Sequence, residues 1–260
     1  MATLAATNPA ENGEVALLYG HEEDKRLGNE AFLTKDYKTA VEHYSNGIVK
    51  LQENPEETVP VNIKAIMHGN RSACYFELGQ YEMAKQDADT STKVDSKYFK
   101  GYWRSAQCAD KLGDTMGSLS ILSGALGMDK GLYGDSKHRK MFSNLRKLRE
   151  QLRTHLEEVP IESYAFSDGR KKVSAYIDLP GISLLDKEDI VFECKEKSLD
   201  LKVYGLNGKC YRLFAPELWA RVDPAKSKFK VKKEKEQLVL LLQKVSTEAI
   251  HSMWESLRRN

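Results

Sequence analysis

The chain has 260 residues, 41% of them hydrophobic and 30% charged, which is enough for two domains that each bury a core. Its formal net charge of +2 is nearly balanced and gives no reason to expect a nucleic-acid-binding protein. The sequence has no apolar run long enough to span a membrane, and its first residues resemble neither a secretory signal nor a mitochondrial presequence. We therefore expect a cytoplasmic protein, with access to the nucleus and without a membrane partner.

Helix-forming residues dominate from about residue 20 to residue 157, after an Ala-, Asn- and Glu-rich segment that we predict to be a disordered leader at 1–19. Small and aromatic residues recur in this part at a repeat spacing. The three units are marked by Gly28, Ala40, Tyr44 and Gly47, by Ser72, Tyr75, Gly79, Tyr81 and Ala84, and by Ala106, Ala109, Gly113 and Ala125. The second and third units lie roughly 34 residues apart, and a Pro-containing connection at 54–57 lengthens the first spacing by about ten.

This pattern resembles the tetratricopeptide repeat, in which small residues let paired antiparallel helices approach closely and stacked pairs bury one core. The resemblance implies three repeats and a capping helix that together span residues 20–157. An apolar stripe supplies the buried face of that last helix: Met141, Leu145, Leu148, Leu152 and Leu156. The same helix is rich in Lys and Arg, which we interpret as its solvent-facing side and not as a nucleic-acid surface.

Five polar side chains occupy repeat-consistent positions on the first helix of each unit, the helix that lines the groove of such arrays. Lys25 and Asn29 lie one helical turn apart, Asn70 is in the second unit, and Lys100 and Arg104 are in the third. Three cations and two amides on one surface suit a peptide that ends in an acidic residue, because its end carries two adjacent carboxylates. Each residue also has a plainer interpretation, such as an asparagine bonded to backbone or an arginine paired with a neighbouring acid.

The set resembles the carboxylate clamp of chaperone adaptors, and this resemblance implies binding to the acidic C-terminal peptide of the 90-kDa or 70-kDa heat-shock chaperone. Phe32, Ala73, Phe76 and Glu77 stand where similar domains contact upstream peptide residues. The run from Tyr75 to Glu77 is more similar to modules that select the 90-kDa chaperone. Phe32 and Phe76 equally suit packing between repeats.

After Pro160 the hydrophobic pattern changes from the period of a helix to that of a strand. Alternating or fully apolar segments predict strands near residues 173–179, 190–194, 199–203, 210–214, 229–231 and 238–242. The pair Asn207-Gly208 is a strong hairpin signal. Six or seven short strands over this length predict an antiparallel β-sandwich, so the whole chain is expected to be an α + β multidomain protein.

The β half resembles the CS domain, and within that family it is most similar to calcyclin-binding protein. The most specific string is Leu206-Asn207-Gly208-Lys209 with Tyr211, and Trp254 with Leu257 extends the similarity toward the end of the chain. The order of repeats followed by a CS domain is similar to that of SGT-type co-chaperones. We predict a linker at 158–163, the CS sandwich at 164–245 and a short C-terminal helix at 246–260.

Two groups of residues in the β half are candidate surfaces. Tyr164 and Phe166 are candidates either for chaperone contact or for packing at the end of the sandwich. Lysines recur at alternate positions and are interpreted as the wet face of an edge strand, where they discourage aggregation: Lys226, Lys228, Lys230, Lys232, Lys233 and Lys235.

No catalytic grouping, phosphate-binding glycine loop or metal-ligand spacing is recognisable, and Cys74, Cys108, Cys194 and Cys210 are expected to be reduced and structural. We therefore predict no enzyme activity, no catalytic residue, no metal and no cofactor. The leading hypothesis is a non-enzymatic co-chaperone adaptor. The alternative, suggested by the resemblance to calcyclin-binding protein, is a scaffold that binds ubiquitin-ligase subunits or a signalling complex.

Overall fold

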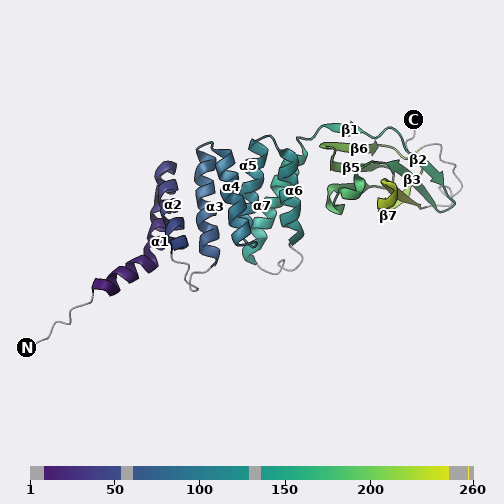
Figure 1. Ribbon diagram of the computed structural model, residues 1–260. Helices are drawn as coiled ribbons and strands as arrows, with labels where there is room; N and C mark the ends of the chain where they lie inside the picture. Colours follow the sequence, from purple (N-terminus) through teal and green to yellow (C-terminus); the bar gives the residue numbers. More distant parts are fainter. Residues whose placement is uncertain (1–8, 54–60, 129–135, 246–256, 258–260) are drawn as a thin grey trace, which may run out of the picture. The chain divides into compact units, whose positions relative to one another are not determined.

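The computed structural model describes residues 9–53, 61–128 and 136–245, together with Leu257 (Figure 1). Its residues divide into two compact units, 1–149 and 150–260, each of which is described by itself. The sequence predicts this boundary at residue 157. In the structure Arg153 already belongs to the second unit, where it is buried and its guanidinium is 2.8 Å from the carboxylate of Asp189.

The first unit is a row of antiparallel helices (Figure 1). Its elements are α1 (Pro9–Leu33), α2 (Tyr37–Glu53), α3 (Val61–Glu77), α4 (Tyr81–Val94), α5 (Phe99–Lys111), α6 (Thr115–Gly127) and α7 (Ser136–Arg153). Successive helices pack as the pairs α1–α2, α3–α4 and α5–α6, and neighbouring pairs touch through α2–α3 and α4–α5. The predicted array of helix pairs followed by one more helix is confirmed.

The turn inside each pair shows the repeat directly. Gly79 and Gly113 have φ values of +75° and +83°, in the left-handed region that glycine adopts without strain. They lie about 34 residues apart, the length of one repeat. Lys35 takes the same place in the first pair with a φ of 63°. The three turns therefore share one conformation, although only two of them have the residue that favours it.

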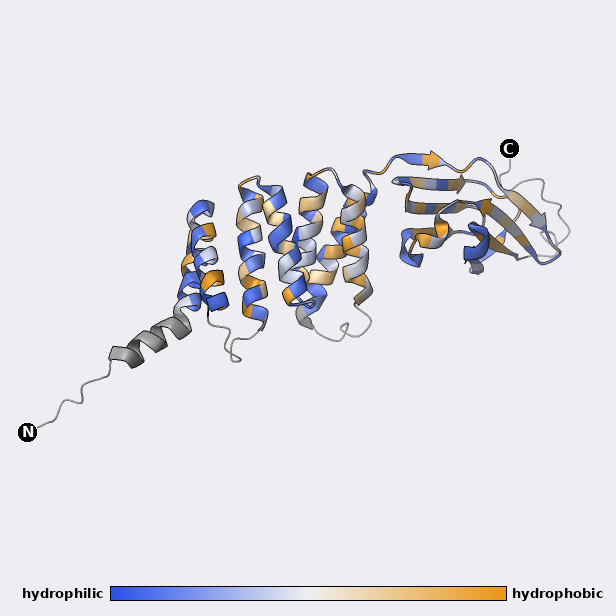
Figure 2. Ribbon diagram, in the orientation of Figure 1, coloured by the Kyte–Doolittle hydropathy of each residue, from blue (hydrophilic) through white to orange (hydrophobic). Residues whose placement is uncertain are grey.

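Close helix approach explains why the marker positions hold small residues. A Cβ at Gly28 in α1 would lie 2.7 Å from the ring of Tyr44 in α2, closer than side chains pack. Tyr44 is buried, as are Ala40 in the same helix and Ala84 in α4. These residues form part of the interior of the array, and hydrophobic and hydrophilic residues alternate along its helices (Figure 2).

Two ends of the array differ from the prediction. Helix α1 begins at Pro9, so it covers residues 9–19 of the segment expected to be a disordered leader. The reason is local, since proline suits the first turn of a helix and Ala and Glu favour its continuation. Helix α7 ends at Arg153, before Leu156, and the buried part of its stripe consists of Phe142, Leu145 and Leu152.

The second unit contains two four-stranded sheets with the strand orders β1-β6-β5-β4 and β2-β3-β8-β7. The strands are β1 (Glu158–Pro160), β2 (Ala165–Asp168), β3 (Lys172–Asp178), β4 (Ile190–Cys194), β5 (Leu199–Leu206), β6 (Lys209–Ala215), β7 (Val222–Lys232) and β8 (Gln237–Lys244). Short 3-10 helices lie at Ile182–Leu184, Lys187–Asp189 and Lys233–Lys235. The predicted sandwich and its strands are confirmed, and the Asn207-Gly208 turn has positive φ at both residues.

The core of the sandwich is formed by every second residue of neighbouring strands. Val173, Ala175 and Ile177 of β3 pair in register with Leu242, Leu240 and Leu238 of β8, and all six are fully buried. Leu257 is also buried in this core. The rest of the predicted C-terminal helix at 246–260, including Trp254, lies outside the described residues.

One sheet departs from the expected antiparallel pattern. Strand β1 runs parallel to β6, with Glu158 opposite Cys210 and Pro160 opposite Arg212. The strand lies within 158–163, the segment predicted to be a linker. Three residues that include a proline carry too little alternation to be recognised as a strand.

Candidate functional site

One cavity of about 500 Å³ lies against the first helix of each pair and the last helix of the array, and Tyr44 of α2 lines it as well. Six of the nine residues predicted for the groove line it: Asn29, Phe32, Asn70, Ala73, Lys100 and Arg104. They come from α1, α3 and α5, so helix packing brings together residues that are far apart in the sequence. Lys25 is half-buried one turn before Asn29 on α1 and is not among the lining residues.

The two asparagines of the cavity form one hydrogen-bonded unit. The amide oxygen of Asn29 accepts bonds from the Tyr44 hydroxyl at 2.7 Å and from Asn70 Nδ2 at 3.2 Å. Burial raises the pKa of Tyr44, so its hydroxyl stays protonated and remains a donor. With its oxygen occupied, the Asn29 side chain has its two N–H donors left for another acceptor, since no bond from them is found among the described residues.

Arg104 is a cation held between two rings. Its guanidinium carbon lies 5.2 Å from the centre of the Phe76 ring and 5.1 Å from that of the Trp103 ring. Burial lowers the pKa of Arg104 from its ordinary value. Within the described ranges no carboxylate lies within 4.0 Å of it, and its hydrogen bond to Gln107 is long, at 3.5 Å. The negative charge of Glu77 offsets part of the lowering of its pKa, but a partly desolvated cation without a carboxylate at ion-pair distance still favours an anionic ligand.

The two lysines are less enclosed. Lys100 is exposed at the cavity, and Lys25 is half-buried on α1. Neither takes part in an ion pair with any residue that the structure describes. By contrast Arg26, also on α1, bonds to both Glu23 and Glu30. The cations near the groove are therefore unpaired, whereas a neighbouring surface cation is paired.

The remaining predicted groove residues take mixed positions. Phe32 and Ala73 line the cavity, although Phe32 also packs edge-on against Tyr37 at 5.4 Å. Phe76 is not a lining residue, but its ring supports Arg104. Glu77 is exposed outside the cavity. Their contact with a peptide stays a prediction.

Sequence reasoning missed a large part of the cavity wall. Tyr98, which directly precedes α5, Trp103 of α5, and Met141 and Asn144 of α7 line it as well. The signal was present in part, because Tyr98 and Trp103 flank Lys100 in the sequence. Met141 equally fits the apolar packing stripe predicted for the capping helix, so the sequence does not single it out as a cavity residue.

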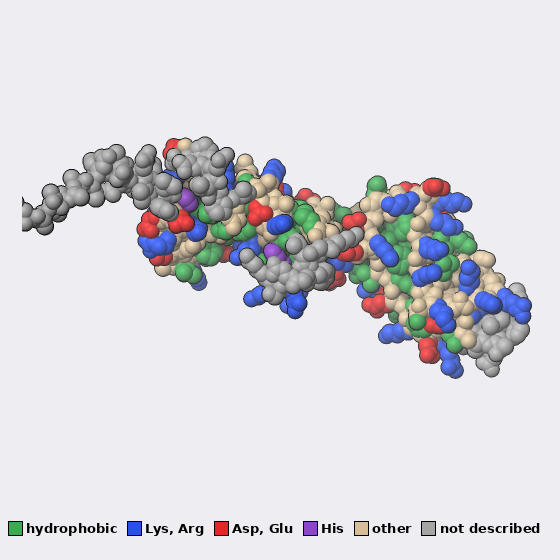
Figure 3. All heavy atoms as spheres, turned by 90° about the horizontal axis from the view of Figure 1, so that it is seen from below, with side chains coloured by type: hydrophobic (Ala, Val, Ile, Leu, Met, Phe, Trp, Pro, Cys, Tyr) green, Lys and Arg blue, Asp and Glu red, His purple; other side chains and the backbone are tan. Residues whose placement is uncertain are grey.

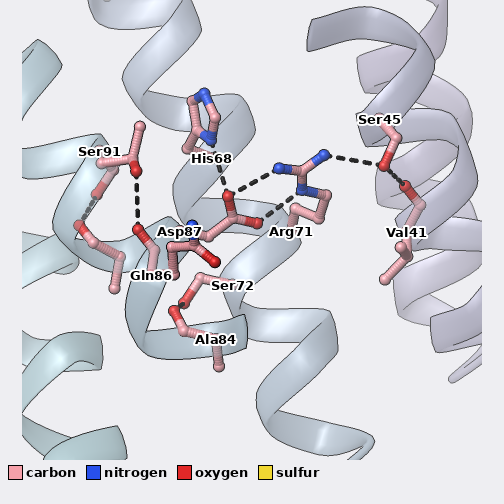
Figure 4. A network of polar contacts seen from close by, with 11 residues as sticks. Val41, Ser45, His68, Arg71, Ser72, Ala84, Gln86, Asp87 and Ser91 are labelled. Atoms are coloured by element: carbon pink, nitrogen blue, oxygen red, sulfur yellow. Dashed lines mark hydrogen bonds and ion pairs between the residues drawn. The ribbon is translucent and has the colours of Figure 1, made fainter. Parts of the chain in front are cut away.

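Behind the groove, the opposite face of α3 is tied to its neighbours by a closed polar network (Figure 4). Asp87 of α4 accepts bonds from Arg71 Nε at 2.6 Å and Nη2 at 2.8 Å, and it lies 2.9 Å from His68 Nδ1. Arg71 Nη1 also donates to Ser45 of α2 at 3.0 Å. Burial alone would raise the pKa of Asp87, but the bonds from Arg71 and His68 hold it below its ordinary value. The network joins α2, α3 and α4.

In the β unit, Tyr164 and Phe166 are half-buried and pack against the sandwich core. Phe166 pairs in register with Ala175 of β3. Four of the predicted lysines are exposed on β7, which ends its sheet, so their interpretation as the wet face of an edge strand is confirmed, whereas Lys233 and Lys235 lie in the 3-10 helix that follows. Basic side chains are spread over the face of this unit seen in Figure 3.

The cysteines are free thiols. Burial raises the pKa of Cys74 to about 12 and that of Cys108 to about 11, so neither is a ready nucleophile. In the part of the chain that the structure describes, no group of three or more His, Cys, Asp and Glu side chains could hold a metal ion. Among the same residues, no helix is both long and apolar enough to cross a membrane.

Comparison with known proteins adds a family and several relatives. Residues 162–244 match the CS domain family. The chain is 39% identical over 81 residues to stress-induced-phosphoprotein 1 of Caenorhabditis elegans, which covers 31% of this chain and 22% of that protein. It is 30% identical over 125 residues to the heat shock protein sti1 homolog of Schizosaccharomyces pombe, covering 48% of this chain and 18% of that one. The chain thus spans about a fifth of the length of these relatives.

A solved structure of the TPR2B domain of yeast Sti1 in complex with pHsp70 has a TM-score of 0.40 to this chain at 23% identity. The alignment covers 50% of this chain and 97% of that one.

Proposed function

We propose that this chain, in which tetratricopeptide-type helix pairs precede a CS domain, is a non-enzymatic adaptor that binds the acidic carboxyl terminus of a heat-shock chaperone. The observation that carries the proposal is the groove itself: Asn29, Asn70, Lys100 and Arg104 surround one cavity, and no acid among the described residues forms an ion pair with its cations. The sequence match to a sti1 homologue named as a heat shock protein supports it.

The chemistry of the ligand follows from the donors. A terminal Asp presents its side-chain carboxylate and the chain-end carboxylate a few ångströms apart. Charge-assisted hydrogen bonds to them are worth about 1.5–3 kcal/mol each, and a micromolar complex needs about 8 kcal/mol net. Two or three such bonds, together with apolar burial in the cavity, are sufficient once ordering costs are subtracted.

Two finer points belong to the same proposal. The first is a carboxylate clamp that includes Lys25, which lies one turn from Asn29 on α1. The second is a preference for the 90-kDa over the 70-kDa chaperone, based on Phe76 and Glu77. Phe76 supports Arg104, and Glu77 is exposed beside the groove, where it can meet an upstream peptide residue.

The CS domain is proposed to contact the folded part of the chaperone or a client. Two weak sites on one chain raise the overall affinity through effective concentration. Replacing Tyr164 or Phe166 by Ala tests this role. A surface role predicts weaker binding to the intact chaperone with an unchanged affinity for its terminal peptide. Loss of the folded sandwich instead assigns both residues to packing.

The decisive experiment is calorimetric titration of the full chain with chaperone C-terminal peptides that end in a free carboxylate or an amide. We expect the amide to bind at least tenfold more weakly, because the site is built for the terminal charge. Lys100→Glu and Arg104→Ala should each weaken the carboxylate form by tenfold or more. Arg26→Ala is the matched control, since Arg26 is already paired on α1. Equal binding of carboxylate and amide would contradict the proposal.

A further inference from the structure

Strand β7 of the β unit carries a row of lysines along the edge of its sheet. The strand ends that sheet, and its regular part, residues 228–232, pairs with β8 without a break in register. Three exposed lysines alternate in this part and are called the lysine row: Lys228, Lys230 and Lys232. Phe229 and Val231, which lie between them, pack against the sandwich core. Because successive side chains of a strand point to opposite faces, the three lysines share the outer face.

The lysine row has no acidic partner. None of its three ammonium groups forms an ion pair with a residue that the structure describes, whereas Lys226, on the same strand, is 3.0 Å from the carboxylate of Asp223. The Lys232 ammonium lies 5.2 Å from the centre of the Tyr176 ring of β3. Like charges directly opposite each other on neighbouring strands are destabilising, and opposite charges are stabilising. The row therefore favours a neighbouring strand that carries acidic residues at alternate positions.

The inner side of the same edge is apolar. Phe192 of β4, the end strand of the other sheet, lies edge-on to Phe229 of β7, with the ring centres 6.3 Å apart. Cys194 of β4 and Val231 of β7 are partly buried against the core beside them. A strand added next to β7 would have these side chains on its inner face and the lysine row on its outer face.

The backbone of β7 can hold such a strand. Alternate residues of an edge strand direct their N–H and C=O groups away from the sheet, and no strand among the described residues pairs with β7 on that side. In strand addition these main-chain groups give the affinity, and alternate side chains give the specificity. The register is irregular between Asp223 and Lys228, so the regular docking edge is residues 228–232.

We propose that β7 binds, as an added strand, an extended segment of a partner protein in which acidic and apolar residues alternate. The acidic side chains lie along the lysine row, and the apolar ones cover the edge beside Phe192 and Val231. Charge complementarity selects this occupant, because the row repels a basic strand and leaves its own charges uncompensated beside a neutral one. The site lies in the β unit and needs no chain-end carboxylate, so it does not depend on the proposed function.

The test is calorimetric titration of the full chain with the peptide Glu-Val-Glu-Val-Glu-Val-Glu, acetylated and amidated. The amide removes the chain-end carboxylate that the groove of the helical array is proposed to bind. Two control peptides are the block sequence Glu-Glu-Glu-Glu-Val-Val-Val, of equal composition, and the alternating sequence with Lys in place of Glu. We expect the alternating acidic peptide to bind roughly tenfold or more tightly than the block peptide, because only alternation aligns the carboxylates with the row. The Lys peptide should not bind.

Charge reversal provides the matching variants. The triple variant Lys228→Glu, Lys230→Glu, Lys232→Glu should lose the acidic peptide and gain the Lys peptide. The control triple variant makes the same charge change at exposed lysines outside β7 and should bind as the wild type does: Lys187→Glu, Lys195→Glu and Lys197→Glu. If circular dichroism shows that the first variant does not fold, replacement of the lysine row by Gln decides instead, and it should weaken the acidic peptide.

Amide hydrogen exchange followed by mass spectrometry separates strand addition from general attraction to anions. Binding of the alternating peptide should slow exchange within residues 228–232. Equal affinity for the alternating and block peptides would reduce the row to a non-specific polyanion surface and overturn the proposal. Binding without slower exchange in β7, or no binding at all, would overturn it too. Each of these results leaves the groove of the helical array untouched, since no probe carries a chain-end carboxylate.

Discussion

Two arginines of the helical array have opposite surroundings. Arg71 bonds twice to the carboxylate of Asp87, which is only 5% exposed, and once to Ser45. Arg104 is held between Phe76 and Trp103 and has no carboxylate partner among the described residues. They lie on adjacent first helices of the array, α3 and α5.

The difference separates a structural charge from a functional one. A buried carboxylate that accepts three bonds within the protein has no capacity for a ligand, and it joins α2, α3 and α4 around the groove. Arg104 lies against two rings and donates one long hydrogen bond, to Gln107, so most of its donors are left for an anion that arrives from outside. Charged residues that lack an ion-pair partner therefore locate the binding site better than the total number of charged residues does.

The largest expected effect is on the closed network. Replacing Arg71 by Met leaves Asp87 buried without its main partner, and we expect the array to lose about 3 kcal/mol of stability. Urea unfolding followed by far-ultraviolet circular dichroism measures this loss. The double variant Arg71→Met, Asp87→Leu should recover most of it, because no charge is then left buried. A single variant as stable as the wild type would show that the network is not structural.

The reverse is expected at Arg104. Arg104→Met should weaken binding of an acidic C-terminal peptide by at least tenfold, about 1.4 kcal/mol, and leave thermal stability unchanged or raised. The reason is that methionine fills the space between the two rings without a desolvated charge. Differential scanning calorimetry and peptide titration on the same sample measure both quantities. A lowered melting temperature would show that Arg104, like Arg71, stabilises the fold.

The pH dependence of stability distinguishes the two clusters further. Since the pKa of Asp87 is lower in the folded protein, its contribution is fully present above its unfolded value of about 3.9 and is lost as pH falls through the folded pKa. Urea unfolding at about pH 7 and about pH 3 should show a smaller drop for Asp87→Asn than for the wild type. Asp87→Asn should also be less stable at neutral pH. Parallel pH profiles would contradict the lowered pKa.

The smallest expected effect is that of adding a Cβ at two glycines, one beside the groove and one away from it. A Cβ at Gly124 in α6 meets nothing within 4 Å, so Gly124→Ala should stabilise the array by about 0.5–1 kcal/mol. Gly69→Ala should destabilise it and weaken peptide binding, because the new Cβ displaces the ring of Tyr98 from the cavity wall. Thermal melts and peptide titrations of the two variants measure the contrast.

Local sequence patterns predicted most of the fold. Small residues such as Gly28 and Ala84 mark helix contacts because a larger side chain does not fit there, and that steric demand is visible in the sequence. Strand alternation likewise located β3, and a fully apolar run located β8. Strand β1 was missed because three residues with a proline carry no periodicity, and its place depends on pairing with β6.

The repeat spacing predicted the part of the candidate site whose residues occupy corresponding helices of successive helix pairs. Asn29, Asn70, Lys100 and Arg104 recur on equivalent helices, and the structure brings them around one cavity. The Arg71–Asp87 network was not predicted, because the two residues meet only when α3 and α4 pack. The contribution of α7 to the cavity was not predicted either. Met141 also fits the apolar stripe by which the last helix packs, and the sequence does not distinguish the two roles.

The rings on either side of Arg104 also bear on the entropy of binding. A free arginine side chain samples many rotamers, and fixing one on association costs about 0.5–1.5 kcal/mol. Phe76 and Trp103 already restrict this guanidinium in the unliganded chain. Much of that conformational cost is thus met when the helices fold, and a peptide that docks there has less disorder to remove than one that meets a mobile surface arginine.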